Sequence, residues 1–350
     1  MSELTYILGA GASYQSIPVV KTFSKRFEKF VLEELSKSFK GWNGADWGDF
    51  IPKAKTLASE ISSHQSFDTY FKKLFHNNLF EEINSSKRLL NMYFFWEHLT
   101  NGEDSTENKE DFKKESKIDK RYDALIAGLL KPYQKQLETF APKVNFITWN
   151  YDLNLFSSLK NYFSPKSTFR EFIEKIETSE SIWEVENQIQ VINMNGYFFS
   201  SCLEECINLK DEKPNLPANF NSKVFKDKIG NDSQRIKFAW EQNDNAITDK
   251  ANTAISNSEN IVVIGYTFPL YNRIVDLGYL NKRVVDSCRI VLQDPQADNL
   301  RTTFLEMFDL PGIDTPNSYL NVKKKIDCSY FYIPSNIFTE KNNFAQISFL

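Results

Sequence analysis

The sequence predicts an α/β fold in which a mostly parallel sheet carries a large helical insertion or cap. Short apolar runs of strand length recur along the chain, and small, polar or turn residues directly follow four of the five. β-Branched and aromatic residues dominate these runs, as is typical of strands buried on both faces of a parallel sheet. A long stretch of helical periodicity separates the first run from the second. The predicted strands are residues 5–8, 144–148, 190–194, 261–266 and 290–293.

The first predicted strand runs directly into the turn Gly9-Ala10-Gly11-Ala12-Ser13. Glycines at this spacing let a pyrophosphate approach the backbone N–H groups, because no Cβ stands in the way. The third glycine of the dehydrogenase fingerprint is absent, so the alternative is a tight turn that only packs a helix against the sheet. The turn favours a Rossmann-like sheet whose dinucleotide site binds the pyrophosphate at this turn.

The connection between the first two strands is far longer than an ordinary crossover. Its apolar side chains recur at helical spacing, with Phe23 and Phe27 on one face of a helix. We therefore expect residues 1–18 and 144–350 to form the nucleotide-binding domain and residues 19–143 to form the helical insertion.

After the second predicted strand the chain presents polar side chains, in the segment T-W-N-Y-D at residues 148–152. The carboxyl ends of parallel strands face the ligand crevice, so Asn150 and Asp152 are expected to contact a sugar or a leaving group. An amide can hold a water molecule or a hydroxyl group, and a carboxylate can orient a ribose. The alternative is that both residues only cap the following helix, predicted over residues 153–159.

The last two predicted strands also end in residues suited to a nucleotide. In Gly265-Tyr266-Thr267, the glycine permits close backbone approach and the threonine can donate to a phosphate oxygen. Asp294 follows the last strand, where a carboxylate can accept from a hydroxyl of the adenosine ribose. Either segment alone is consistent with a simple turn, and their joint occurrence at strand ends favours a shared site.

Together these segments resemble the sirtuin family, in the family's order and across most of the chain. The turn at residues 9–13 matches the G-A-G-x-S loop that binds NAD, and Pro18 is similar to the proline that follows that loop. Thr148 opens a segment that looks like the T-x-N-x-D motif, which grips the nicotinamide ribose. Residues 265–267 resemble the G-[TY]-[ST] loop on the adenine side. The Phe-Pro pair after them is similar to the extension of this loop in prokaryotic sirtuin-like proteins of anti-phage defence.

The resemblance implies that NAD is a substrate whose bond between nicotinamide and ribose is broken. Residues 9–13 would bind the pyrophosphate, Asn150 would position the attacking water, and Asp152 would hold the nicotinamide ribose. Such a reaction passes through an oxocarbenium-like state that chiefly needs a desolvated pocket and a positioned water. The leading expectation is therefore an NAD+ hydrolase that acts as an effector of bacterial anti-phage defence. The helical insertion is not covered by the resemblance.

One departure from the family bears directly on the chemistry. The family's catalytic histidine-glycine pair is replaced here by Asn195 and Gly196, and the three histidines, His64, His76 and His98, all precede the second predicted strand. Histidine contributes a proton-transfer factor on the order of a hundredfold, so hydrolysis with Asn195 at this position is expected to be slow or absent. The alternative function is a non-catalytic NAD or ADP-ribose-binding regulatory subunit of a defence complex. An NAD-dependent oxidoreductase is disfavoured, because no hydride-transfer acid is evident.

The cysteines and the charge balance exclude other classes. Cys202, Cys206, Cys288 and Cys328 lack the paired spacing of a zinc ribbon, so no metal and no peptide deacylation are expected. With 42 basic and 46 acidic residues and a net charge of -4, nucleic acid is not expected as a direct partner. No signal or membrane segment is evident, which predicts a cytoplasmic protein. An NAD+ hydrolase of this kind must be inactive at rest. We therefore expect a protein partner or a homo-oligomer to control its activity through contacts with the helical insertion.

Overall fold

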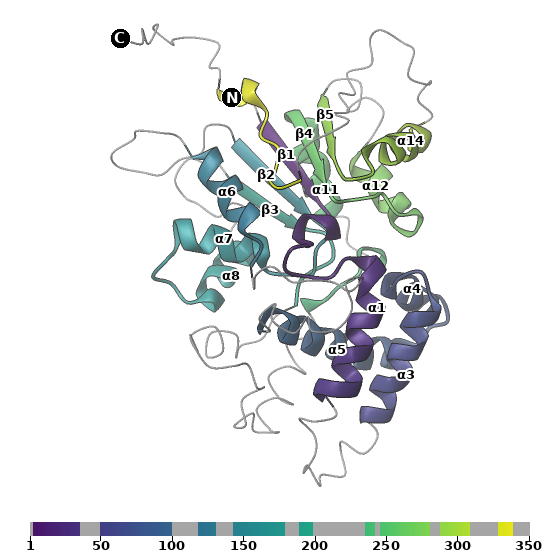
Figure 1. Cartoon of the computed structure of the whole chain (residues 1–350). Coiled ribbons are helices and arrows are strands. Elements are labelled where there is room, and N and C mark those ends of the chain that lie inside the picture. Colours follow the sequence, from purple (N-terminus) through teal and green to yellow (C-terminus); the bar gives the residue numbers. More distant parts are fainter. Residues whose placement is uncertain are drawn as a thin grey trace, which may run out of the picture.

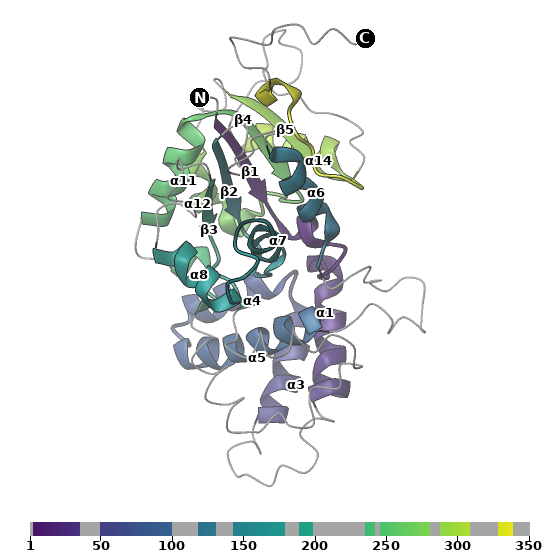
Figure 2. The same ribbon diagram turned by 90° about the vertical axis from the view of Figure 1, so that its left-hand side faces the viewer.

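The computed structural model of this chain describes residues 3–35, 50–99, 118–130, 143–178, 189–198, 235–241, 246–280, 288–308 and 328–338. Two layers are visible: a sheet covered by helices, and a group of helices beyond the carboxyl ends of the strands (Figure 1 and Figure 2). The predicted α/β class is confirmed.

In the described part of the chain the sheet has five strands, all parallel, in the order β3-β2-β1-β4-β5. The chain builds one half outward from β1 to β3 and then crosses to the other side of β1 for β4 and β5. This is the strand order of a Rossmann-type sheet, so that prediction is also confirmed. The strands are β1 (Glu3–Leu8), β2 (Lys143–Thr148), β3 (Ile189–Asn193), β4 (Ser258–Ile264) and β5 (Arg289–Gln293).

Alternate residues of each strand enter two separate cores. In β1, Leu4, Tyr6 and Leu8 pack with α6, α7 and α8, whereas Ile7 packs with α11, α12 and α14. Because both faces are covered, apolar residues occur on both faces of the strands, and the polar residues Thr5, Asn145 and Asn260 are buried among them. Helix α6 falls within residues 19–143 but covers the sheet. The covering helices are α6 (Lys120–Leu129), α7 (Asn154–Phe163), α8 (Phe169–Thr178), α11 (Ala246–Ser256), α12 (Arg273–Tyr279) and α14 (Ala297–Met307).

The second group of helices, called here the helical layer, faces the carboxyl ends of the strands (Figure 1). Aromatic rings fill its interior, where Phe23 lies 4.6 Å from Phe67 and 5.0 Å from Tyr93 between ring centroids. A capping box between Ser66 and Thr69 begins α4. The layer consists of α1 (Val20–Lys29), the π-helical segment η2 (Phe30–Leu35), α3 (Phe50–Ser63), α4 (Phe67–His76) and α5 (Phe80–Leu99).

Some element boundaries differ from the prediction. The strand predicted over residues 261–266 ends at Ile264, because Gly265 adopts the left-handed φ of +59° and leaves the extended conformation. The turn after β1 is a short 3-10 helix (Ala10–Ser13), and α1 begins only at Val20. No helix in the described residues is both long enough and apolar enough to cross a membrane.

Candidate functional site

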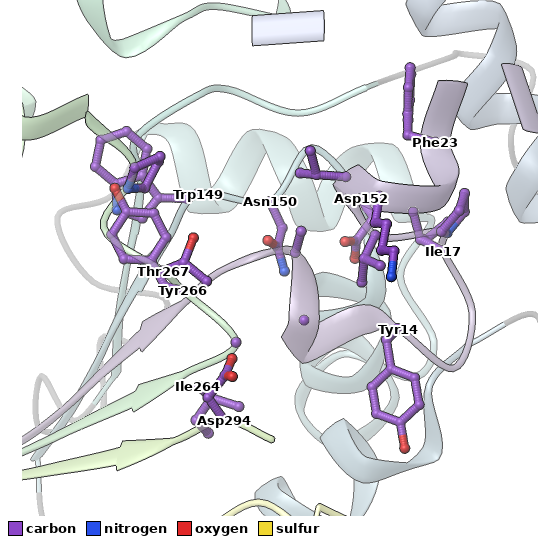
Figure 3. Close-up of a pocket in the computed structure, with 18 of the residues that line it drawn as sticks. Tyr14, Ile17, Phe23, Trp149, Asn150, Asp152, Ile264, Tyr266, Thr267 and Asp294 are labelled. Carbon is purple, nitrogen blue, oxygen red and sulfur yellow. The ribbon is translucent and has the colours of Figure 1, made fainter. Parts of the chain in front are cut away.

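A pocket of about 550 Å³ lies where the carboxyl ends of the strands meet the helical layer. The strand order reverses between β1 and β4, and ligands of open α/β sheets bind in the crevice at such a point. Figure 3 shows Asn150 between the Trp149–Tyr266 pair on one side and Asp152 on the other. Of the residues predicted from the sequence, those that line this pocket are Ala10, Gly11, Pro18, Asn150, Asp152, Asn195, Gly265, Tyr266, Thr267 and Asp294.

The other predicted residues, Gly9, Ala12, Ser13 and Thr148, do not line the pocket but stand next to residues that do. The Ser13 hydroxyl accepts a hydrogen bond from the Asn150 side chain, and the Thr148 hydroxyl accepts one from the Asn150 backbone N–H. These residues therefore support the pocket wall from behind.

The glycines of the first turn are required by the turn after β4. The N–H of Gly9 donates to the Ile264 carbonyl and that of Gly11 to the Gly265 carbonyl, each at 3.0 Å. A Cβ on Gly9 would lie 2.5 Å from the Gly265 oxygen, and a Cβ on Gly265 would lie 2.4 Å from the Ala12 nitrogen. Packing of the two turns thus accounts for Gly9 and Gly265, as expected from the alternative that the first turn serves packing only.

That packing limits how the turn can bind phosphate. The N–H of Ala12 donates to the Gly9 carbonyl at 2.8 Å, so three N–H groups of the turn have partners within the protein. Ala10 and Gly11 are the turn residues that reach the pocket wall. A ligand would therefore meet the backbone of these two residues rather than the whole predicted loop.

Asn150 presents an unpaired acceptor at the pocket wall. Its Nδ2 donates to the Ser13 hydroxyl at 3.2 Å and to the Tyr122 hydroxyl at 3.4 Å, while its buried Oδ1 has no hydrogen-bond partner among the described residues. A buried acceptor without a donor is unfavourable by about 1–3 kcal/mol. A ligand hydroxyl or amide that donates to this oxygen would remove that cost.

Asp152 both caps the following helix and lies at the pocket wall. Its Oδ1 accepts from the backbone N–H of Asn154 at 2.9 Å and from the Asn154 side chain at 2.7 Å, so it does cap α7. It also lines the pocket, and burial raises the pKa of its carboxyl above the ordinary value. Asn150 makes no such bond to α7, so the capping alternative does not describe it.

The loop after β3 carries an amide where the resemblance implies a histidine. The Asn195 Nδ2 donates to the Trp149 carbonyl at 2.9 Å, which ties this loop to the segment after β2. His98 accepts a hydrogen bond at Nε2 from the Leu153 N–H at 3.3 Å and does not line the pocket. The structure therefore brings no histidine of the described residues to the pocket wall.

One wall of the pocket is an aromatic pair formed by the predicted residue Tyr266 and by Trp149, which was not predicted as a site residue. The Trp149 and Tyr266 rings stack at 5.1 Å with an interplanar angle of 9°. The Tyr266 hydroxyl donates to the buried carboxylate of Asp276 at 2.9 Å, and the Trp149 Nε1 donates to the Tyr279 hydroxyl at 3.3 Å. Burial raises the Asp276 pKa to about 7. Each residue stands in a strand-end motif, but no local pattern predicts their stacking, because the two come together only when β2 and β4 enter one sheet.

A buried arginine, also missed, braces the first turn. The Arg121 guanidinium donates to the Ala12 carbonyl at 2.8 Å and pairs with Asp119 in front of α6. It lies over the rings of Tyr14 and Phe331, at 4.3 Å and 4.8 Å from their centroids. With these partners, Arg121 holds the turn in place.

Asp294 and Thr267 line the part of the pocket formed by β4 and β5. The Asp294 Oδ1 accepts from the Gln296 N–H at 2.8 Å, so the carboxylate also caps the turn before α14. No group of three or more metal-binding side chains occurs among the residues that the structure describes. Cys202 and Cys206 lie outside those residues, and Cys328 is part of the pocket wall.

No family model matches the chain, and no curated protein matches it. The functional assignment therefore depends on the residues of the pocket.

Proposed function

We propose that this chain is a sirtuin-like NAD+ hydrolase that cleaves the bond between nicotinamide and ribose. The observation that carries the proposal is the convergence of strand ends on one pocket: the turn after β1, the polar segment after β2, and the turns after β4 and β5. A dinucleotide is long enough to need all of them, whereas a simple turn or a helix cap needs none.

The proposed orientation of NAD+ follows from the chemistry of each strand end. The pyrophosphate lies against the backbone of Ala10 and Gly11, and the adenosine lies toward Thr267 and Asp294. The nicotinamide riboside lies toward Asn150, where the unpaired Oδ1 accepts from a hydroxyl of the sugar or from the attacking water.

The aromatic end of the pocket supports this orientation. Phe23, Phe67 and Phe94 line it together with Asp152. An apolar enclosure that contains a carboxylate suits a ring that is positively charged before cleavage and neutral afterwards. Water attacks C1′ of the ribose as the bond to the nicotinamide nitrogen breaks and its electron pair stays on nicotinamide. The products are nicotinamide, ADP-ribose and a proton.

A second candidate function is supported by the loop after β3. The Asn195 amide, which takes the place of the family's histidine, cannot accept a proton and already donates to Trp149. This observation favours a subunit that binds NAD+ or ADP-ribose without cleaving it and regulates a partner. The role in anti-phage defence and control by a partner or a second copy belong to the proposal in either form.

The two functions are separated by incubating the purified full-length chain with NAD+ and measuring free nicotinamide and ADP-ribose. Asn150→Ala is the matched variant, because it removes the unpaired acceptor and leaves the contacts among Gly9, Gly11 and Gly265 in place, although the hydrogen bonds to Ser13 and Tyr122 are lost as well. Hydrolysis predicts nicotinamide release that falls at least about a hundredfold in the variant. Nucleotide binding without nicotinamide release, also in the presence of candidate partner proteins, would leave the regulatory subunit as the function.

A further inference from the structure

A buried carboxylate from the helical layer contacts the segment that carries Asn150 and Asp152. Asp68 is the second residue of α4, is 6% exposed, and lines the pocket. Its Oδ1 accepts a hydrogen bond at 2.9 Å from the hydroxyl of Tyr151, the residue between Asn150 and Asp152. The Tyr271 hydroxyl lies 3.5 Å from its other oxygen. Asp68 therefore joins α4 to the loops after β2 and β4.

The Tyr151 ring is enclosed by the helical layer. Together with this packing, the contact of its hydroxyl with Asp68 fixes the position of the loop after β2. The ring stacks on Phe94 at 5.7 Å and lies 5.4 Å from Phe67, both in the helical layer. Its backbone carbonyl accepts from the Phe198 N–H at 2.9 Å. A shift of α4 that moved Asp68 would have to move the Tyr151 ring, and with it the neighbouring backbone.

Burial of the Asp68 carboxylate is unfavourable, and its place in the first turn of α4 offsets only part of that cost. Among the described residues no cation pairs with Asp68, and burial raises its pKa to about 6 although two phenols donate to it. A buried titratable group with a raised pKa at a pocket wall is typical of a functional position.

We propose that Asp68 is a positioning residue for the NAD+ cleavage proposed above. By holding the Tyr151 hydroxyl, it orients Asn150 and Asp152 toward the nicotinamide ribose. The inference rests on the proposed function and extends it, because it makes the helical layer a part of the active geometry. A second bond supports the connection: the Lys72 Nζ, one turn further along α4, donates to the Tyr271 carbonyl at 2.7 Å.

The test uses four variants of the full-length chain: Asp68→Ala, Asp68→Asn, Tyr151→Phe, and Asp68→Ala with Tyr151→Phe. Positioning predicts that Asp68→Ala and Tyr151→Phe each lower kcat at least about tenfold while KM for NAD+ stays within about threefold. The double variant should be no worse than the poorer single variant, because both remove one contact. Asp68→Asn keeps an acceptor oxygen and should recover most of kcat. The control is Asp249→Asn, an exposed carboxylate on α11, which should leave kcat unchanged.

Each other outcome has a defined meaning. A kcat within twofold of the parent in Asp68→Ala, or additive effects in the double variant, would overturn the positioning role and leave the hydrolase intact. An Asp68→Asn variant as poor as Asp68→Ala would also overturn it, since the charge itself would then act. If the parent chain releases no nicotinamide, the proposed function fails, and the Asp68 inference, which rests on it, fails with it. A parent chain that releases nicotinamide with an unaffected Asp68→Ala variant overturns the Asp68 inference alone.

Discussion

The backbone N–H of Gly11 donates to the carbonyl oxygen of Gly265 at 3.0 Å, which joins the turn after β1 to the turn after β4. These turns follow the two strands between which the order of the sheet reverses. Their contact forms part of the pocket wall, and neither turn has room for a Cβ at the closest points. The glycines therefore determine the geometry of the pocket wall through packing.

Gly265→Ala should destabilise the fold. The residue has a φ of +59°, and its added Cβ would meet Gly11 and Ala12 at 2.4 Å. We expect the free energy of unfolding to fall by about 2–4 kcal/mol, measured by urea denaturation. The control is Gly128→Ala on α6, where the Cβ meets only the flexible end of the Ile333 side chain. Equal stability of the two variants would contradict the packing argument.

Arg121→Met should destabilise the protein more than a combined change at Arg121 and Asp119. Asp119 is fully buried and pairs with the Arg121 guanidinium. The single variant therefore leaves the Asp119 charge uncompensated, at a cost of about 3–5 kcal/mol. Adding Asp119→Asn removes that charge and keeps a side-chain oxygen that accepts from the backbone N–H of residue 121. This change should restore part of the stability. Urea denaturation of both variants checks the order. A double variant less stable than the single one would show that the charge is compensated elsewhere.

Asp276 should make stability fall with rising pH. Burial raises its pKa from 3.8 to about 7, with Tyr266, Tyr279 and Arg273 facing it. The folded state holds the proton more tightly than the unfolded chain, so the free energy of unfolding decreases as pH rises from about 4 to 7, by up to about 4 kcal/mol. Asp276→Asn should lose this dependence, and its stability relative to the parent should rise between pH 4 and pH 8. A pH-independent difference in denaturation experiments would refute this assignment.

Asp294→Ser should relax the preference for NAD+ over NADP+. Under the proposed orientation, the carboxylate lies near the adenosine ribose, where it would accept from a hydroxyl and repel a 2′-phosphate. Serine can still accept from the Gln296 N–H, so the turn before α14 should persist. We expect the NADP+ affinity relative to NAD+ to rise at least about tenfold, measured by calorimetry. An unchanged ratio would place the adenosine elsewhere.

Much of the fold could be predicted because its signals are local. Each of the five strands contains a short run that is mostly apolar, and each predicted run overlaps an observed strand by at least four residues. Boundaries were less certain where backbone conformation decides them, as at Gly265. The residues at strand ends could also be listed, since a parallel sheet exposes its carboxyl ends at one edge.

The pocket wall could be predicted only in part. Asp68 and Arg121 are absent from any strand-end motif, because their partners are distant in sequence and are chosen by packing. Trp149 and Tyr266 do stand in such motifs, but nothing local predicts that their rings stack. The sequence also did not predict that Asp152 would both cap α7 and line the pocket.

By itself, the sequence determined which segments become strands and which side chains leave the sheet at its carboxyl edge, since side-chain shape and hydrophobic spacing act over a few residues. Only the tertiary structure decided which of those ends meet, which glycines are required by contact, and which buried acceptors lack a donor. Those properties depend on distances between elements, and such distances are set by strand order and close packing rather than by neighbours along the chain.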